Sequence, residues 1–301
     1  MTAWQQRTWE QLPGPVQEAV QRYTGPLTSR DPVPATGTRS VVVLHLDGAA
    51  SGPVILKAAP CEEDGGAAIA REQTIHVAHE HALPAPALRW RSQVANWRVS
   101  LFTHVPGRLA MLAPGGEDVM RVLNSQIFDL RVAVCREAVR RAEVALSPVR
   151  DDCLTLVDAA GDLDAGERDL LRRALLDFDV NTVEGEVIVH GDLTSRHILI
   201  AQDAEAGNPV TLVDWSGGMY GDPCVDITGF GLHLGERGHA PDYVEMLLLD
   251  RLPAWKAAPL ATVDGLIAMR ALTVTAPASP GCLFTPLEAG LAWLRYRHRL
   301  D

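Results

Sequence analysis

Cysteine is scarce in this chain of 301 residues, and the five cysteines lie far apart with no C-x-x-C pair among them. This spacing fits neither a disulfide framework nor a structural zinc site. No apolar run approaches the roughly 18 residues that span a bilayer. The first residues also lack the basic and apolar regions of a signal peptide. We therefore expect a cytoplasmic protein of a reducing compartment, with no membrane partner.

Basic residues are in the minority: Lys and Arg number 27, Asp and Glu number 38, and the formal net charge is −11. A non-specific nucleic-acid binder needs a basic face to displace counterions, so we expect no nucleic acid as a partner. Only Lys57 and Lys256 are lysines. The surroundings of each lysine are therefore informative.

The first hundred residues contain several short β-branched and apolar runs. The runs at 40–46, 54–58 and 97–103 predict strands, and the turn-forming segment DGAASGP joins the first two as a hairpin. A helix followed by a proline-rich approach is expected within residues 1–35, and a second helix at 62–82.

From about residue 115 the pattern becomes helical. Long amphipathic helices are predicted at 117–146 and 165–178, joined by a polar stretch. Short apolar strands follow, and then further helices. The strands are expected at 187–189, 198–200 and 210–213, and the helices at 242–249, 260–275 and 286–299.

This order of elements predicts an α+β fold with two lobes. The expected division is an N-lobe of residues 1–103, a hinge at 104–109 and a C-lobe of residues 110–301. A chain of this length can bury roughly three quarters of its unfolded surface, which is enough for a full core.

The segment VIVHGDLTSRHILI, followed by VTLVDWSGGMYGDPCVDI, carries most of the chemistry. Asp192 and Asp214 each follow a short apolar strand, where loops build sites on a rigid scaffold. Two such carboxylates with His197 between them suit magnesium, which prefers oxygen and is usually shared with substrate phosphates. The alternative is that these are polar turn residues, and for Asp222 in its GDP turn that alternative stays open.

The pattern H-G-D-L-x-x-x-H-I-L, then V-D-W and G-D-P-x-x-D, resembles the catalytic region of the aminoglycoside phosphotransferase family. That family has a protein-kinase-like fold and moves the γ-phosphoryl of a nucleoside triphosphate onto a small-molecule hydroxyl. The motif spans about residues 187–230. Outside it the chain agrees with the family in the order of its predicted elements and not in residue identity. The resemblance implies a small β-rich N-lobe that binds nucleotide and a larger helical C-lobe that builds the acceptor pocket.

The resemblance also implies roles for the residues of the motif. Asp192 is similar to the catalytic aspartate that accepts the proton of the substrate hydroxyl, and Asp214 to the aspartate that holds magnesium at the β- and γ-phosphates. His197 stands where the family usually has asparagine as the second metal ligand, and macrolide phosphotransferases look similar here. Imidazole is a softer ligand than a carboxamide oxygen, so a weakened metal site stays open. The remaining motif positions are expected to support the catalytic loop: His190, Asp222 and Asp226.

Lys57 lies in the segment VILKA, a strand that should be mostly buried. Burial of an unpaired ammonium costs several kcal/mol, so Lys57 needs an anion nearby. The resemblance implies a nucleotide phosphate together with a helix glutamate. Glu72 is the candidate because it shares a helix face with Ile69 and Ile75. Snorkelling of Lys57, or pairing of Glu72 with Arg71 or solvent, is the alternative.

Two further segments match the nucleotide site of the family by position. In the family a loop before the first strand covers the phosphates, so Gly37 and Ser40 are expected to contact them through backbone N–H groups. Backbone groups of the inter-lobe hinge are expected to hydrogen-bond the purine. The residues at that position are Phe102, Thr103, His104 and Val105. Nothing there distinguishes adenine from guanine, so the donor is expected to be ATP or GTP.

The sequence thus predicts a magnesium-dependent phosphotransferase acting on a small-molecule hydroxyl, as a monomer or homodimer. An antibiotic of the macrolide or aminoglycoside type is the first expectation for the acceptor. The eight acidic and seven basic residues from position 225 onward nearly balance, which favours a bulky, partly apolar acceptor over a polycation. A housekeeping kinase for choline, homoserine or a sugar amine, and a catalytically silent nucleotide-binding protein, are the alternatives.

Overall fold

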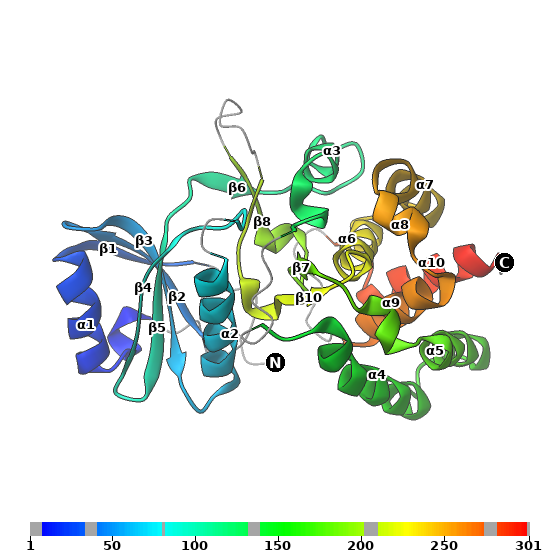
Figure 1. Ribbon diagram of the computed structural model, residues 1–301, viewed down its shortest axis with the longest axis horizontal. Coiled ribbons are helices and arrows are strands. Elements are labelled where there is room, and N and C mark those ends of the chain that lie inside the picture. Colours follow the sequence, from blue (N-terminus) through cyan, green and yellow to red (C-terminus); the bar gives the residue numbers. More distant parts are fainter. Residues whose placement is uncertain are drawn as a thin grey trace. The chain divides into compact units, whose positions relative to one another are not determined.

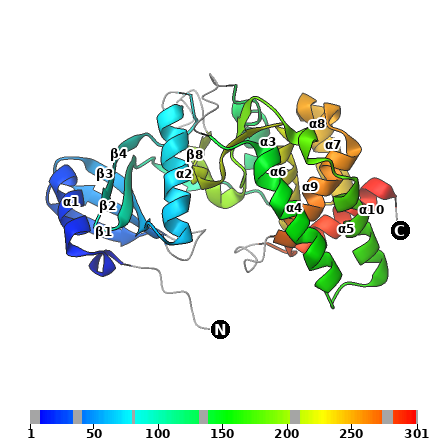
Figure 2. The ribbon, with the colours of Figure 1, turned by 60° about the horizontal axis from the view of Figure 1, so that its bottom comes forward.

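A computed structural model of the chain describes residues 8–33, 41–79, 82–131, 139–201, 210–273 and 282–299. The chain divides into two compact units (Figures 1 and 2). Unit 1 comprises Met1–Arg108 and Thr211–Gly217, and unit 2 comprises Leu109–Val210 and Gly218–Asp301. The division falls inside two short strands, β6 (Gly107–Leu109) and β9 (Val210–Leu212).

Unit 1 is built on a five-stranded antiparallel sheet with the order β1-β2-β3-β5-β4. Its strands are β1 (Leu27–Pro32), β2 (Val42–Gly48), β3 (Gly52–Pro60), β4 (Leu88–Val94) and β5 (Trp97–Thr103). The predicted hairpin is present as β2 and β3, and the strand predicted at 97–103 is β5. Both edge strands, β1 and β4, were not predicted, because they carry polar residues and lack a buried face of consecutive apolar side chains.

Two helices lie on opposite faces of this sheet (Figures 1 and 2). The short 3₁₀ helix η1 (Trp9–Gln11) and α1 (Gly14–Thr24) pack Trp9, Val16 and Val20 into the core of one face. Helix α2 (Asp64–Ala78) lies against the other face, where Gln73 donates to the Ser100 hydroxyl at 2.8 Å. Because side chains alternate along a strand, the residues of β3 and β5 that point away from α1 point toward α2.

Unit 2 is mainly helical (Figure 1). Its helices are α3 (Asp118–Leu123), α4 (Ala142–Ala159), α5 (Ala165–Asp177), α6 (Cys224–Glu236), α7 (Pro241–Arg251), α8 (Pro253–Ala257), α9 (Leu260–Thr273) and α10 (Pro286–His298). Short 3₁₀ helices are η2 (Gln126–Phe128), η3 (Val180–Val183) and η4 (Ser195–His197), and η5 (Trp215–Gly217) belongs to unit 1. The strands β7 (Val187–Val189) and β10 (Met219–Gly221) pair antiparallel, and β8 spans Ile198–Ala201.

The single long helix predicted at 117–146 is wrong. Helix α3 ends at Leu123, and α4 begins only at Ala142 and runs through the stretch that was expected to be a polar connection. Pro148 lies inside α4, in its second turn, where a proline normally argues against a helix. The fold tolerates the proline, and α4 continues past it to Ala159.

Helix α6 was not predicted at all, although it lies at the centre of unit 2. Every residue from Cys224 to Leu234 is buried. A helix buried on all sides has no polar face, so it shows no amphipathic period in the sequence. None of the helices in the described parts of the chain is long and apolar enough to cross a membrane.

Candidate active site

In unit 1, Lys57 lies between two carboxylates. Its Nζ is 2.9 and 2.8 Å from the two carboxylate oxygens of Glu72, and 3.1 Å from Oδ1 of Asp214. Lys57 comes from β3, Glu72 from the buried face of α2, and Asp214 from the chain between β9 and η5. The exposed fractions of the three side chains are 13%, 3% and 27%, so only Asp214 presents much surface to solvent.

The two carboxylates keep Lys57 charged. Burial alone would lower the pKa of Lys57, but the neighbouring charges of Asp214 and Glu72 outweigh it and raise that pKa above its ordinary value. Glu72 also accepts the backbone N–H of Trp215 at 3.1 Å, which ties η5 to α2. The ammonium is therefore permanent at neutral pH and fixed in position.

Asp214 has an unusual backbone conformation. Its φ is +66°, in the left-handed region that few residues other than glycine, asparagine and aspartate enter. A residue held there costs of order 1–3 kcal/mol, and such residues gather at functional sites. The turn after β9 thus places the Asp214 carboxylate beside Lys57, at a cost in backbone conformational energy.

The expected purine segment lies at the end of β5. Phe102 is buried. Its ring centroid is 5.0 Å from that of His76, with the ring planes tilted by 58°, and 5.7 Å from Lys57 Nζ. The backbone N–H of Thr103 donates to Ala87 and that of His104 to Pro53. The expected phosphate contacts Gly37 and Ser40 lie outside the described residues.

In unit 2, a buried carboxylate holds the backbone before Asp192. Asp226, in the first turn of α6, accepts the N–H of His190 at 2.6 Å and that of Gly191 at 2.8 Å. Gly191 has a φ of +77°, so the chain turns sharply after β7. Burial raises the pKa of Asp226 to about 6, although both N–H bonds oppose the rise. Asp192 itself remains 47% exposed.

Two histidines pack beside Asp192. The backbone N–H of Asp192 is 3.3 Å from Nδ1 of His190, and Nδ1 of His197 is 2.8 Å from the Asp192 carbonyl oxygen. A carbonyl only accepts, so Nδ1 of His197 carries the hydrogen and the lone pair of the neutral ring is on Nε2. Nδ1 is also 3.5 Å from Oδ2 of Asp192. His197 is 2% exposed and lies in unit 2, whereas the other expected metal ligand, Asp214, lies in unit 1.

The Asp222 carboxylate has a structural role at the beginning of α6. Its Oδ1 accepts the N–H of Cys224 at 2.8 Å, at the beginning of α6. A carboxylate there satisfies an N–H group that has no partner within the helix and interacts favourably with the helix dipole. Asp222 thus helps to fix the helix that carries Asp226.

Arg270, on α9, contacts the loop of Gly191 and Asp192 and was not predicted. Its Nη2 donates to the Gly191 carbonyl at 2.9 Å, and its Nη1 is 3.4 Å from Oδ1 of Asp192. Gly229 of α6 leaves room for it, because a Cβ there would lie 2.6 Å from Nη2. The motif gives no hint of Arg270, which follows Asp192 by 78 residues.

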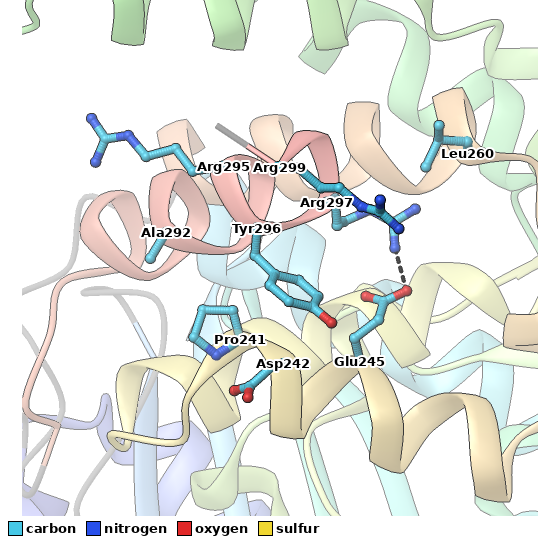
Figure 3. A pocket seen from close by; sticks show the side chains of 9 residues that line it. All are labelled: Pro241, Asp242, Glu245, Leu260, Ala292, Arg295, Tyr296, Arg297 and Arg299. Carbon is cyan, nitrogen blue, oxygen red and sulfur yellow. Dashed lines mark hydrogen bonds and ion pairs between the residues drawn. The ribbon is translucent and has the colours of Figure 1, made fainter. Parts of the chain in front are cut away.

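A separate cavity of about 770 Å³ lies among α7, α9 and α10 in unit 2 (Figure 3). It is lined by Pro241, Asp242, Glu245, Leu260, Ala292, Arg295, Tyr296, Arg297 and Arg299. Arg297 pairs with Glu245 at 2.5 Å and with Asp264 at 2.6 Å, so its charge is already neutralised. No expected site residue lines this cavity.

Comparison of the sequence with protein families identifies the class of protein to which the chain belongs. Residues 33–260 match the phosphotransferase enzyme family, abbreviated APH. The chain therefore belongs to that family, and the resemblance noted in its sequence is confirmed. No curated protein sequence is a significant match.

Solved structures with the same fold include three antibiotic kinases. A thermostable mutant of aminoglycoside phosphotransferase APH(4)-Ia, in a ternary complex with AMP-PNP and hygromycin B, has a TM-score of 0.56 and 15% identity, covering 95% of this chain and 96% of its own. The GDP complex of aminoglycoside 2'-phosphotransferase-IIIa has a TM-score of 0.61 and 14% identity, covering 94% and 98%. Macrolide 2'-phosphotransferase type I has a TM-score of 0.55 and 18% identity, and the match covers 92% of this chain and 96% of its own. The predicted α+β, kinase-like fold is thus confirmed.

Proposed function

We propose that the protein transfers the γ-phosphoryl group of ATP or GTP to a hydroxyl of a small molecule, with an antibiotic of the macrolide or aminoglycoside type as the acceptor. The observation that carries the proposal is the placement of Lys57 between Glu72 and Asp214. A permanent ammonium fixed beside a partly exposed carboxylate suits a nucleotide phosphate and its metal ion. Two proteins of the same fold have structures with AMP-PNP and with GDP, which supports a nucleotide donor.

Unit 1 supplies the proposed nucleotide-binding groups. Lys57 donates to phosphate oxygens, and Glu72 holds it in position. Asp214 offers a carboxylate oxygen, the ligand type that magnesium prefers. Mg²⁺ bound there would neutralise charge on the β- and γ-phosphates. His197, which lies in unit 2, is the proposed second ligand, and Nε2 of its ring would supply the lone pair.

Unit 2 supplies the proposed base. One carboxylate oxygen of Asp192 accepts the proton of the acceptor hydroxyl as the hydroxyl oxygen forms a bond to the γ-phosphorus. The bond from the γ-phosphorus to the bridging oxygen breaks, and the nucleoside diphosphate leaves with that electron pair. Asp226 and Arg270 keep the loop in place while Asp192 stays open to the acceptor.

Arg270 also bears on the choice of acceptor. Its guanidinium lies beside the proposed base, so an acceptor hydroxyl at Asp192 would approach a positive charge. A polycation is disfavoured there by like-charge repulsion. An acceptor with few amines, as in a macrolide, therefore suits the loop better than an aminoglycoside.

The test is phosphate transfer from labelled Mg-ATP and Mg-GTP to macrolides, aminoglycosides, choline-type alcohols, homoserine and sugar amines, with Asp192→Asn as the control. We expect label in a macrolide-type acceptor and none with the variant. Label only in choline, homoserine or a sugar amine would favour a housekeeping kinase. Nucleotide binding without transfer to any acceptor would favour a catalytically silent protein, and absence of nucleotide binding would refute the proposal.

A further inference from the structure

Three potential metal ligands meet at the end of α6, well apart in sequence from the expected magnesium ligands. They are Nδ1 of His233, a carboxylate oxygen of Glu236 and Sγ of Cys282, and all three atoms lie within 4.8 Å of one another. His233 Nδ1 is 2.9 Å from Glu236 Oε2, and Cys282 Sγ is 3.7 Å from the same oxygen. We propose that His233, Glu236 and Cys282 bind a divalent metal ion of the zinc type.

The backbone brings these three residues together. His233 and Glu236 are three residues apart in the last turn of α6, so their side chains leave the same face of the helix. The N–H groups of Leu283 and Phe284 both donate to the Glu236 carbonyl, at 2.7 and 3.2 Å. The segment that carries Cys282 is therefore fixed against the helix end by hydrogen bonds independent of any metal.

The geometry suits a tetrahedral ion. Zinc with bonds of about 2.0–2.3 Å keeps its ligand atoms roughly 3.3–3.6 Å apart. The observed separation of 3.7 Å between sulfur and oxygen is close to that range, and that of 2.9 Å between nitrogen and oxygen must widen by roughly 0.4 Å. Three protein ligands leave the fourth position for water.

The donor set selects the class of metal. A thiolate and an imidazole favour zinc and similar borderline-soft ions, and disfavour magnesium and calcium, which take oxygen ligands. One thiolate and one carboxylate also balance the two positive charges of the ion. The C-terminal end of a helix adds negative potential that favours a cation.

A hydrogen-bond partner beyond the ligands orients the imidazole. His233 is 1% exposed, and its Nε2 is 2.9 Å from the Ser195 hydroxyl oxygen. Metal-bound histidines regularly donate their other ring N–H to such a group, which fixes the ring. Binding would move the hydrogen of His233 from Nδ1 to Nε2, so that Nε2 would no longer accept from Nε of Arg237, now 3.4 Å away, and would release the thiol proton of Cys282 to solvent.

Ser195 connects this site with the catalytic loop. It is three residues from Asp192 and two from His197, and its hydroxyl oxygen also accepts from Nη2 of Arg237 at 2.7 Å. A metal ion on His233 would therefore brace the loop from the side of α6. The inference itself concerns metal binding and stands whether or not the chain transfers phosphate.

The test is titration of the chelator-treated full chain with Co²⁺, followed by competition with Zn²⁺. We expect one Co²⁺ per chain, a thiolate-to-cobalt charge-transfer band and release of about one proton. Cys282→Ser should remove the band and weaken binding by more than tenfold, Glu236→Gln should weaken binding comparably, and Ser195→Ala should weaken it about tenfold.

Cys61→Ser is the matched control, because Cys61 is the other partly exposed cysteine among the described residues. This variant should bind Co²⁺ as the unmodified chain does. Circular dichroism of each variant separates loss of a ligand from loss of the fold. The proposal is overturned if the unmodified chain shows no charge-transfer band, or if the band survives Cys282→Ser and disappears in Cys61→Ser.

Discussion

Lys57 lies within strand β3 of unit 1 and Asp192 follows the short strand β7 of unit 2, and the two side chains are held by different means. Lys57 is fixed by the side-chain charges of Glu72 and Asp214 and is 13% exposed. The loop of Asp192 is fixed through its backbone, by bonds to Asp226 and Arg270, and the Asp192 carboxylate is 47% exposed. The first arrangement makes stability depend on the buried charge of Lys57, whereas the second leaves the Asp192 carboxylate about half exposed.

Replacement of Asp192 should separate activity from stability most strongly. In Asp192→Asn we expect transfer to fall by about 10²–10⁴, because the proposed general base is lost. Nucleotide affinity and the midpoint of urea denaturation should stay unchanged, because the carboxylate is half exposed. Steady-state kinetics, calorimetric nucleotide binding and urea denaturation check this, and near-normal turnover would contradict it.

Replacement of Lys57 should have the opposite pattern. Lys57→Met leaves Glu72 buried without its partner, which typically costs about 3–5 kcal/mol of unfolding free energy. The double variant Lys57→Met, Glu72→Leu should recover much of this loss, because no unpaired buried charge remains.

Lys256→Met is the control, since Lys256 is exposed and is the one other lysine of the chain. Urea denaturation of the four proteins compares them. A Lys57→Met protein as stable as the Lys256→Met protein would show that the ion pair does not contribute.

Asp226 should make the stability of the protein depend on pH between about 4 and 6. Its pKa is raised from 3.8 to about 6 in the folded chain, so the folded state holds a proton that the unfolded state has already released. The stabilisation is complete below about pH 4 and is lost as the pH rises through about 6. A shift of this size corresponds to roughly 2–3 kcal/mol.

The measurement compares Asp226→Asn with the unmodified chain across this range. The stability advantage of the unmodified chain should shrink by roughly 2–3 kcal/mol from pH 4 to pH 6. A constant difference would mean that burial does not control the Asp226 carboxyl.

Arg270 should show a smaller effect, confined to turnover. Arg270→Met loosens the loop before Asp192, and we expect kcat to fall by roughly tenfold, less than the ~10²-fold that a 1 Å misplacement can cost. The KM for nucleotide should stay unchanged, and Arg270→Lys should recover part of the lost kcat.

Gly229→Ala should lower kcat by a smaller factor, because its Cβ would displace the guanidinium. Arg251→Met is the control, since Arg251 pairs with its exposed neighbour Asp250 on α7. Equal losses of kcat in the Arg251 and Arg270 variants would refute a positioning role.

Sequence reasoning was reliable where one buried strand ends in a chemically distinctive residue. The strands before Asp192 and Asp214 were placed within a residue or so of β7 and β9, because short β-branched runs have few alternative structures. Elements without a contrast between apolar and polar faces were missed. Helix α6 is buried on all sides from Cys224 to Leu234, and the edge strand β1 is polar along almost its whole length.

Contacts between distant segments could not be read from the sequence. Arg270 reaches Asp192 from 78 residues away, and Cys282 reaches Glu236 across 46 residues. No spacing rule relates such pairs, because the packing of α6 against α9 and α10 decides which residues meet. The scattered cysteines were expected to exclude a structural zinc site, and the proposed site differs from that expectation in needing only one of them.

The left-handed backbone of Asp214 has a consequence for random mutagenesis of the chain. Asparagine and glycine tolerate this conformation, whereas a β-branched residue such as valine does not. A library screened only for well-folded protein would accept asparagine or glycine at this position, and a library selected for the proposed phosphotransfer would return aspartate alone. Selection for folding and selection for activity would therefore retain different residues at position 214.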